Sequence, residues 1–465
     1  MVMGLGLHGG GLESARFLLK RGAEVSVTDL RDEKTLLPSI ERLDAACGEL
    51  GGKPVRYILG RHEIEDFKNV DIVIKNPGVR PDSPFLQAAK RIETDISLFL
   101  SESKARLFAV TGTKGKSFTS SALNFILNSC GKSFLGGNIT VSPLNFPQEP
   151  GENDNVVLEL SSFQLGDLKG RKAADGSALL KPAASILTAI MPDHLDRYVS
   201  MEEYVDDKRN IYRGQDSKRV TVAGDDNWGK SFLRETKARP LVYSRCELAK
   251  DANGGWLSDG KGYARLCGFP GVSQEITELV PQRLLVSGDH QKLNMLSAAL
   301  AAYACGVKAE KILSALAGFK GIEHRLEFFH EANGIRFYND SAATIPEAAA
   351  ACIEALSPRQ PLVLVTGGTD KNLDFTLLAK TAAKAKAVIL LAGSGSEKLK
   401  LLLGEAGISF EGPFDDLDKA VVCALENAQK GCAVALSPGC ASFGMFLNEF
   451  DRGRKWKEAV LRLSS

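Results

Sequence analysis

A glycine-rich turn between an apolar segment and a helix-compatible segment constrains this chain more than any other feature. Residues 107–110 predict a strand, and residues 120–127 predict a helix. The turn between them contains Gly112, Gly115, Lys116 and Ser117. Glycines let backbone N–H groups surround an anion, a lysine adds charge near the outer phosphates, and a serine hydroxyl can bind Mg²⁺. The segment therefore predicts a phosphate loop and ATP-driven chemistry.

The loop is shorter than the standard phosphate-loop pattern. In that pattern a glycine stands five residues before the glycine that precedes the lysine, and Val110 occupies that place here. A tight turn with an exposed lysine is therefore the alternative interpretation. The strand before the turn and the helix after it favour the phosphate loop.

Composition and charge exclude several classes of partner. Hydrophobic residues make up 44% and charged residues 25% of the 465 residues, which is typical of a globular protein of about three domains. The formal net charge of +1 provides no field that would attract nucleic acid or an anionic membrane. No apolar run is long enough to span a bilayer. We therefore expect no nucleic-acid partner and no membrane.

The cysteines indicate a cellular compartment. The nine cysteines are scattered, and none forms a C-x-x-C pair. This pattern is typical of reduced thiols in a cytoplasmic protein, and it favours neither a disulfide framework nor a zinc site. We therefore expect a cytoplasmic location.

The N-terminal segment carries a second glycine motif. Residues 4–9 have the G-x-G-x-x-G spacing, and a predicted strand at residues 24–28 ends at Asp29. Taken alone, this fingerprint predicts a dinucleotide site and an NAD-dependent oxidoreductase. Only three residues precede the first glycine, so we expect the natural chain to begin a few residues upstream. Another predicted strand, residues 70–74, leads into a loop at residues 75–78.

Three polar side chains of the middle segment are candidate catalytic or metal-binding residues. Glu159 lies within an apolar predicted strand, where a carboxylate needs either a metal ion or a salt bridge. His194 follows a strand and stands beside Asp193 and Asp196, which leaves a structural and a functional interpretation equally open. Lys208, among charged neighbours, has the pattern of a solvated helix face.

The C-terminal third predicts another doubly wound sheet. Strand-like runs at residues 335–338, 362–365, 387–391 and 433–436 alternate with helical stretches. Polar loops at residues 339–341, 367–371 and 437–442 follow three of these strands. Because the carboxyl ends of parallel strands meet at one edge, we expect these loops to form a site.

These patterns together predict an α/β protein of three domains. Residues 1–99 would form a Rossmann-like domain that binds a nucleotide-type ligand, and residues 100–320 a central P-loop ATPase-like α/β domain. Residues 321–465 would form a C-terminal Rossmann-like α/β domain.

In this order the motifs resemble those of the Mur ligase family of ATP-dependent amide-forming ligases. The resemblance covers essentially the whole chain and rests on residues 112–117, 158–164 and 193–197, the pair His324-Arg325, and residues 437–442. The short N-terminal domain and residues 436–446 are similar to those of members that add D-glutamate to UDP-N-acetylmuramoyl-L-alanine. The alternatives within the superfamily are a ligase for a different amino acid and a folate polyglutamylating ligase, which would not need the N-terminal glycine-turn domain.

The resemblance implies a reaction and its reactants. ATP and Mg²⁺ would activate the carboxylate of UDP-N-acetylmuramoyl-L-alanine as an acyl phosphate, and D-glutamate would then displace phosphate. The product would be a peptidoglycan precursor, made by a cytoplasmic monomer whose partners are small molecules.

The resemblance also implies roles for residues in the central domain. Lys116, His194 and Lys208 would be catalytic, with Lys208 carbamylated by CO₂. The metal ligands and their surroundings would be Ser117, Glu159, His194 and Lys208. ATP would be bound by Gly112, Thr113, Lys114, Gly115, Lys116, Ser117, Phe118, Gln291, Asn294, Arg325 and Asp340.

Two further sets of residues follow from the same resemblance. The UDP substrate would be bound by Gly6, Leu7, His8, Asp29, Arg31, Asn76, Pro77, Gly78, Asn138 and Gln164. The amino acid would be bound by Thr344, Lys371, Ser442 and Phe443.

Three positions depart from the family pattern. Ala342 stands where the pattern has a lysine, Gln291 where it commonly has an asparagine, and Glu449 interrupts an Asn-Phe pair. These departures bear on the amino acid, and they leave the ligase chemistry intact. The other interpretations explain less: an oxidoreductase leaves Lys116 and Glu159 without a role, and an inactive nucleotide-binding regulator would not need to retain them.

Overall fold

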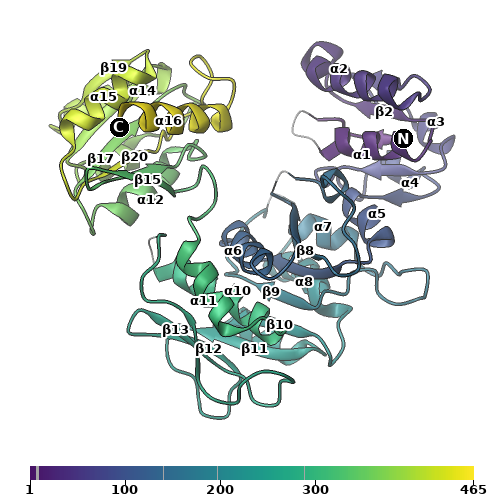
Figure 1. Cartoon of the computed structure of the whole chain (residues 1–465). Helices are drawn as coiled ribbons and strands as arrows, with labels where there is room; N and C mark the ends of the chain where they lie inside the picture. Colours follow the sequence, from purple (N-terminus) through teal and green to yellow (C-terminus); the bar gives the residue numbers. More distant parts are fainter. Residues whose placement is uncertain (7–9, 140, 196, 287–288, 465) are drawn as a thin grey trace. The chain divides into compact units, whose positions relative to one another are not determined.

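The computed structural model describes residues 1–6, 10–139, 141–195, 197–286 and 289–464 (Figure 1). The chain forms two compact units, and each is described by itself. The first consists of Met1–Gln282 with Lys292–Leu316, and the second of Arg283–Gln291 with Ala317–Ser465.

The first unit begins with a five-stranded parallel sheet in the order β3-β2-β1-β4-β5. Its strands are β1 (Val2–Met3), β2 (Ser26–Asp29), β3 (Arg56–Leu59), β4 (Val73–Lys75) and β5 (Ile92–Glu93). Its helices are α1 (Gly10–Lys20), α2 (Glu33–Leu50), α3 (Ile64–Lys68), α4 (Pro84–Gln87) and α5 (Asp95–Glu102). The strand expected at residues 70–74 begins only at Val73, because Val70 and Asp71 lie in the bend after α3.

A nine-stranded sheet forms the rest of the first unit, in the order β14-β13-β12-β11-β10-β9-β6-β8-β7. The strands are β6 (Arg106–Thr111), β7 (Ser133–Gly137), β8 (Asn155–Glu159), β9 (Ala184–Leu187), β10 (Val220–Gly224), β11 (Arg239–Ser244), β12 (Gly254–Ser258), β13 (Lys261–Arg265) and β14 (Thr277–Val280). All pair in parallel except β13, which is antiparallel to both neighbours. The chain order reverses beside β6, and such a switch point favours ligand binding at the carboxyl ends of the strands.

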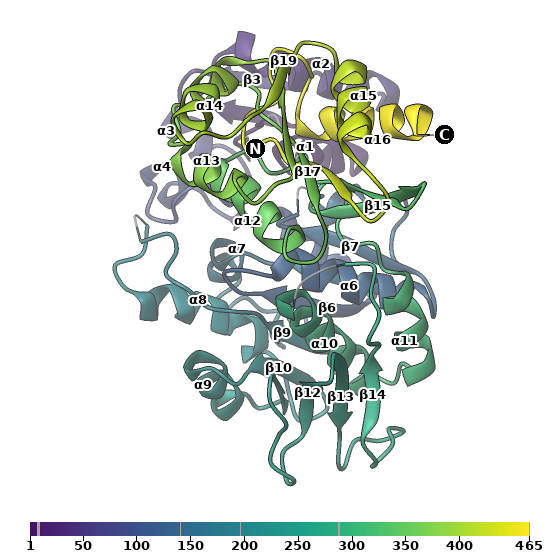
Figure 2. The same ribbon diagram turned by 90° about the vertical axis from the view of Figure 1, so that its left-hand side faces the viewer.

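Helices cover this sheet, and a short 3-10 helix, η1 (Pro143–Asn145), precedes β8. The helices are α6 (Lys116–Asn128), α7 (Ser162–Asp167), α8 (Met201–Arg213), α9 (Asn227–Glu235), α10 (Asp289–Ala304) and α11 (Ala309–Gly318). Both α6 and α10 lie against the sheet (Figure 2). Among the helices that the structure describes, none is long and apolar enough to cross a bilayer.

The second unit contains a six-stranded sheet in the order β15-β16-β20-β17-β18-β19. The strands are β15 (Glu327–Ala332), β16 (Ile335–Asn339), β17 (Leu362–Thr366), β18 (Ala387–Leu391), β19 (Glu411–Phe414) and β20 (Ala433–Leu436). Its helices are α12 (Pro346–Leu356), α13 (Thr376–Ala382), α14 (Ser394–Glu405), α15 (Leu417–Asn427) and α16 (Glu449–Leu463). Only β15 is antiparallel to its neighbour.

Alternate residues of the strands build two cores in this unit. Leu362 and Leu364 pack with α12, α13 and α14 on one face, while Val363 and Val365 pack with α15 and α16 on the other. A parallel sheet buried on both faces is the α/β architecture expected from the sequence, so the predicted fold class is confirmed. The exact domain limits stay a prediction.

A buried ion pair joins the N-terminal sheet to the central part of the first unit. The Lys75 Nζ at the end of β4 lies 2.6 Å from Asp167 Oδ2 at the end of α7, and the two side chains are 3% and 9% exposed. Burial lowers the pKa of Lys75 and raises the pKa of Asp167, while the mutual attraction opposes both changes. Either charge alone would therefore be buried without compensation.

We expect Lys75→Met to lower the free energy of unfolding by about 3–5 kcal/mol, because it leaves the Asp167 carboxylate buried and unpaired. Urea unfolding followed by fluorescence measures the change. The exposed pair of Lys53 with Glu24 gives a matched control, and Lys53→Met should cost no more than about 1 kcal/mol. The double variant Lys75→Met/Asp167→Leu should lose less than the sum of its single variants, and strict additivity would contradict this account.

Candidate active site

The glycine loop between β6 and α6 has the conformation that the sequence predicts. Gly112 and Gly115 have φ angles of +144° and +90°, which side chains rarely adopt. A Cβ atom on Gly112 would lie 1.9 Å from Thr188 Oγ1, and one on Gly115 would lie 2.9 Å from Asn294 Oδ1. Both positions therefore require glycine, and Asn294 of α10 packs directly against the loop.

Helix α6 presents its N-terminus at the end of this loop. The first N–H groups of a helix have no acceptor within it and carry a partial positive charge, so Lys116, Ser117 and Phe118 open a natural anion site. The Lys116 Nζ donates a hydrogen bond of 3.0 Å to the carbonyl of Thr113. The N–H groups of Thr113 and Lys114 instead donate to the carbonyl of Ala189, which fixes the loop to the chain after β9.

Lys208 is buried beneath the same loop. Its side chain is 1% exposed, and its Nζ donates to the carbonyl of Gly112 at 2.9 Å and lies 4.4 Å from the centre of the Tyr204 ring. Burial, reinforced by the nearby charge of Lys116, lowers the pKa of Lys208 to about 7. The solvated helix face predicted from the charged neighbours of Lys208 is therefore wrong. Tyr204 and Lys208 are four residues apart, so both lie on the buried face of α8.

Glu159 ends β8 as a buried carboxylate, 1% exposed. Its Oε1 accepts a hydrogen bond of 3.1 Å from Asn138 Nδ2, while its Oε2 is buried without a hydrogen-bond partner. Within the described part of the chain, no basic side chain forms an ion pair with Glu159, so the salt-bridge interpretation finds no support. A buried carboxylate oxygen without a partner is a suitable ligand for a hard cation.

His194 lies on the loop after β9, where its φ angle is +54°. Its ring centre is 4.9 Å from that of Phe163 on α7, and its Nε2 is 3.9 Å from Asp193 Oδ2. The next residue of α7, Gln164, is buried, and its Oε1 accepts from the backbone of Ser161 at 3.0 Å as a helix cap. Asp196, the second aspartate of the sequence motif, lies outside the described residues.

The described UDP-substrate residues of the N-terminal sheet lie at the carboxyl ends of β1, β2 and β4, whereas Asn138 follows β7 and Gln164 lies on α7. The Asp29 carboxylate accepts hydrogen bonds from the N–H of Gly6 at 3.2 Å and from the N–H of Arg31 at 3.0 Å. These bonds connect the loop after β1 with the loop after β2. A Cβ atom on Gly4 would lie 3.3 Å from Asn76 Cβ, so the glycine turn and the loop of Asn76, Pro77 and Gly78 are adjacent. Leu7 and His8 lie outside the described residues.

Arg197 connects this loop to the segment of His194. Its guanidinium donates to the carbonyl groups of Gly78 and Val79, both at 3.3 Å, and its Cζ lies 3.8 Å from the centre of the Phe163 ring. No sequence pattern predicted this contact, because a single arginine after His194 does not indicate which backbone carbonyl groups it will bind.

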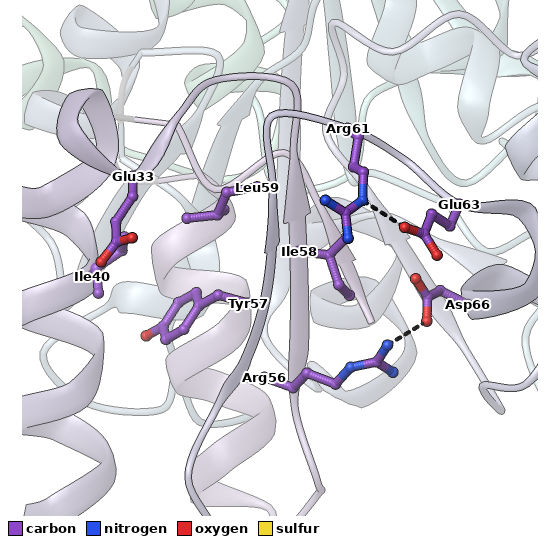
Figure 3. A pocket seen from close by; sticks show the side chains of 9 residues that line it. All are labelled: Glu33, Ile40, Arg56, Tyr57, Ile58, Leu59, Arg61, Glu63 and Asp66. Atoms are coloured by element: carbon purple, nitrogen blue, oxygen red, sulfur yellow. Dashed lines mark hydrogen bonds and ion pairs between the residues drawn. The ribbon is translucent and has the colours of Figure 1, made fainter.

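A separate hollow lies at the edge strand β3 (Figure 3). Its charged side chains pair among themselves, Arg56 with Asp66 at 2.7 Å and Arg61 with Glu63 at 2.5 Å. None of the predicted site residues lines it.

In the second unit, Asp340 organises the segment that contains Arg325. Its Oδ2 accepts a hydrogen bond of 2.6 Å from Ser437 Oγ, and its Oδ1 accepts one of 2.9 Å from the N–H of Leu326. Burial raises the pKa of Asp340 to about 7, although both hydrogen bonds favour its ionised form. Gln291, in the first turn of α10, has a buried Oε1 without a hydrogen-bond partner.

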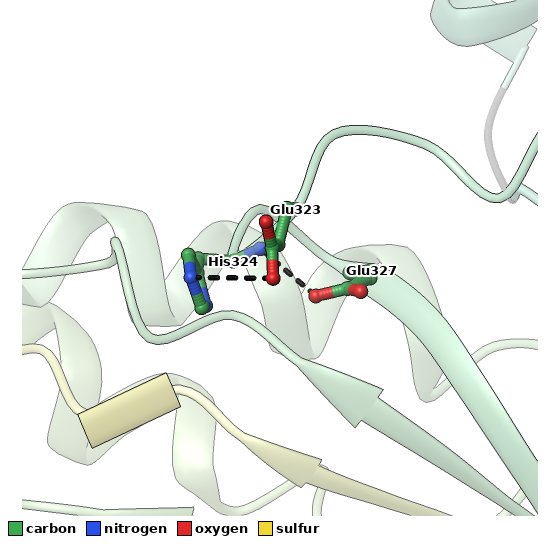
Figure 4. A group of neighbouring side chains, drawn as sticks. All are labelled: Glu323, His324 and Glu327. Carbon is green, nitrogen blue, oxygen red and sulfur yellow. Dashed lines mark hydrogen bonds and ion pairs between the residues drawn. The ribbon is translucent and has the colours of Figure 1, made fainter. Parts of the chain in front are cut away.

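His324, next to Arg325, lies in a cluster with Glu323 and Glu327 (Figure 4). Lys457 of α16 lies 2.7 Å from the Glu323 carboxylate and 3.1 Å from that of Glu327, so a protein cation already pairs with both acids. Asn339 Nδ2 donates to His324 Nδ1 at 2.9 Å and to Glu327 Oε2 at 3.0 Å. The cluster therefore fixes the turn of His324 without needing a metal ion.

The predicted amino-acid residues lie on loops at the carboxyl edge of this sheet. Thr369 and Ala441 exchange backbone hydrogen bonds of 3.1 and 2.9 Å, which joins the loop of Lys371 to that of Ser442. Ser442 is buried, whereas Phe443 is 62% exposed and Lys371 is exposed. Thr344 is half-buried on the loop after β16. The three loops predicted to form a site are thus neighbours.

Comparisons with known proteins agree with this arrangement. Residues 1–97 match the family model of the MurD-like N-terminal domain of Mur ligases, residues 110–302 the Mur ligase middle domain, and residues 324–440 the Mur ligase glutamate ligase domain. The UDP-N-acetylmuramoylalanine–D-glutamate ligase of Treponema pallidum is 39% identical, over 99% of this chain and 96% of that relative.

Two solved structures share the fold. The UDP-N-acetylmuramate-alanine ligase of Thermotoga maritima aligns with a TM-score of 0.58 at 20% identity, over 99% of this chain and 98% of that chain. The MurF ligase of the same organism, in complex with ADP, aligns with a TM-score of 0.53 at 16% identity, over 95% and 96% of the two chains. With domain matches over most of residues 1–440 and a full-length relative at 39% identity, this chain belongs to the Mur ligase family.

Proposed function

We propose that this chain is an ATP-dependent ligase that joins D-glutamate to UDP-N-acetylmuramoyl-L-alanine during peptidoglycan precursor synthesis. The observation that carries the chemistry is that two lysines bind the glycine loop: Lys116 of α6 and Lys208 of α8 donate to the adjacent carbonyl groups of Thr113 and Gly112. The name of the full-length relative from Treponema pallidum supports the two substrates.

The reaction would proceed in two steps. The carboxylate of the UDP substrate attacks the γ-phosphate of ATP, which forms an acyl phosphate and ADP. The amine of D-glutamate then attacks the acyl carbon, forms the amide and expels phosphate. Phosphoryl transfer depends mainly on positioning and on charge neutralisation, and Lys116 with the N-terminus of α6 would supply positive charge beside the phosphates.

The donor set fits Mg²⁺. Glu159 has a buried oxygen without a partner, and we propose that it and Ser117 hold one ion while His194 and Lys208 surround a second. When bound, Mg²⁺ would neutralise charge between the carboxylate and the triphosphate. A neutral amine can attack CO₂, forming an N–C bond and releasing a proton. The lowered pKa of Lys208 leaves part of its amine neutral, which supports carbamylation of Lys208 to an anionic group suited to a hard cation.

The remaining predicted residues keep their roles as proposals. Gln291, Asn294, Arg325 and Asp340 would contact ATP together with the glycine loop, and the loops around Asp29 and Asn76 would bind the UDP substrate with Asn138 and Gln164. Thr344, Lys371, Ser442 and Phe443 would hold the amino acid. The ADP complex of a MurF ligase with the same fold supports the nucleotide site.

We also propose that the enzyme works as a cytoplasmic monomer on small molecules, from three domains limited to residues 1–99, 100–320 and 321–465. All nine cysteines are free thiols, which fits a reducing compartment.

We expect phosphate release from ATP, Mg²⁺ and UDP-N-acetylmuramoyl-L-alanine to depend on D-glutamate when a panel of D- and L-amino acids is tested. The presence of Ala342 and Glu449 near the amino-acid loops makes this panel informative. Release with another amino acid alone would keep the ligase chemistry and change its specificity. Absence of release with every amino acid would contradict the proposed function.

We expect Lys116→Ala to lower kcat for phosphate release by about a hundredfold or more, because it removes a charge that stabilises the transition state. Binding of the UDP substrate, measured by calorimetry, should remain at the wild-type affinity. Lys132→Ala, at an exposed lysine between α6 and β7, is the matched control and should retain wild-type kcat. A wild-type rate in Lys116→Ala would refute the phosphate-loop assignment.

We expect Lys371→Ala to raise the KM for D-glutamate by roughly tenfold or more, because a charged contact typically contributes about 1.5–3 kcal/mol. The KM for ATP should change by less than about twofold. Steady-state kinetics with each substrate varied in turn measure both values, and Lys380→Ala on α13 serves as the control at an exposed lysine. Equal increases in the two KM values would refute the role of Lys371.

A further inference from the structure

A fully buried arginine lies in the first turn of α16. Arg452 is 1% exposed and makes three hydrogen bonds: Nε to Ser341 Oγ at 3.0 Å, Nη2 to the carbonyl of Ser341 at 2.8 Å, and Nη1 to the carbonyl of Cys440 at 3.1 Å. All three acceptors are neutral. In the described part of the chain, no carboxylate oxygen lies within 4.0 Å of the Arg452 guanidinium.

The acids near Arg452 compensate its charge incompletely. The charges of Glu449 and Asp340 raise the pKa of Arg452 by less than burial lowers it. Burial raises the pKa of Asp340 to about 7, so this carboxyl group is only partly ionised at neutral pH. Burial lowers the pKa of Arg452 to about 10, which still leaves the guanidinium protonated at neutral pH. Because the three acceptors of Arg452 are uncharged, a nearby anion would stabilise the buried cation further.

The position of the guanidinium shows where such an anion would lie. Arg452 lines a small hollow together with Gly367, Gly368, Ser442 and Phe443. A Cβ atom on Gly368 would lie 2.7 Å from the carbonyl oxygen of Ala441 and 3.8 Å from Arg452 Nη1, so the loop of Gly368 packs closely over the buried guanidinium. Ser442 and Phe443, two of the residues proposed to bind the amino-acid substrate, therefore line the same hollow as Arg452.

The hydrogen bonds of Arg452 also join two loops at the carboxyl edge of the sheet. Ser341 lies on the loop after β16 and Cys440 on the loop after β20, and Ser341 Oγ donates in turn to the carbonyl of Glu449 at 2.7 Å. On the third loop, Asp370 is paired with Lys398 at 2.5 Å, which offsets the negative charge beside Lys371. The guanidinium therefore supplies a positive charge and also holds the loops of Ser341 and Cys440 in position.

We propose that Arg452 is a specificity-determining residue that selects a dicarboxylic amino acid. Its buried positive charge stabilises the side-chain carboxylate of the substrate against the loop of Ser442, while Lys371 provides an exposed cation for the other carboxylate. This inference rests on the proposed function, and it assigns to one buried residue the preference for D-glutamate over its uncharged isostere D-glutamine.

The test compares kcat/KM for D-glutamate and D-glutamine in the wild type and in Arg452→Met. We expect the ratio of the two values to fall by at least about tenfold in Arg452→Met, because the charge acts only on the charged side chain. Arg454→Met, which removes an exposed arginine of the same helix, is the matched control and should keep the wild-type ratio. A merely structural role would lower kcat/KM for both amino acids equally and leave the ratio unchanged, which would overturn the inference.

A second variant keeps the inference testable if thermal unfolding shows that Arg452→Met is not folded. Arg452→Lys retains the charge but loses the forked geometry, so kcat/KM should fall for both amino acids while their ratio stays within about threefold of the wild type. A tenfold loss of the ratio in a folded Arg452→Lys would overturn the inference. Failure of the wild type itself to release phosphate with D-glutamate would overturn the proposed function as well, whereas an active wild type with an unchanged ratio in Arg452→Met would refute the role of Arg452 alone.

Discussion

Two lysine side chains hydrogen-bonded to consecutive carbonyl groups set the geometry on which the candidate active site depends. Lys116 donates to Thr113 from one side of the glycine loop, and the buried Lys208 donates to Gly112 from below. Because each ammonium group is held by backbone, the loop brings two positive charges together where a polyanion would bind. The nearby charge of Lys116 lowers the pKa of Lys208 further than burial alone. The proposed phosphate binding by Lys116 and the proposed carbamylation of Lys208 are therefore coupled.

Local patterns were sufficient to predict the fold class and the backbone of the site. The alternation of strands, helices and glycine turns predicted three α/β sheets, and Gly112 and Gly115 occupy backbone conformations that only glycine adopts readily. The polar loops at strand ends were predicted to meet, and those of Ser341, Thr369 and Ala441 do so through hydrogen bonds to one another or to Arg452. Such features follow from short-range sequence signals and from the geometry of parallel sheets.

Burial of charged side chains could not be predicted from the sequence. Lys208 and Arg452 stand among acidic and basic neighbours, so their local pattern is that of a solvated helix. Each is nevertheless on the inner face of its helix, because its place is decided by strands and loops that are distant in the chain. The contacts of Arg197 with the loop of Gly78, and of Lys457 with Glu323, join residues more than a hundred positions apart. No local sequence pattern predicts such contacts.

The buried pair of Lys75 and Asp167 has a consequence for how such a chain could be divided or recombined. The lysine comes from the first parallel sheet and the aspartate from the helix after β8, so the two modules share one buried charge pair. Arg171 adds a second link of the same kind, at 2.7 Å from Glu93. A chimera that takes one module from a relative without the matching charge would bury an unmatched ion at this contact. Exchange of these modules between family members is therefore restricted to pairs that match their charges across this contact.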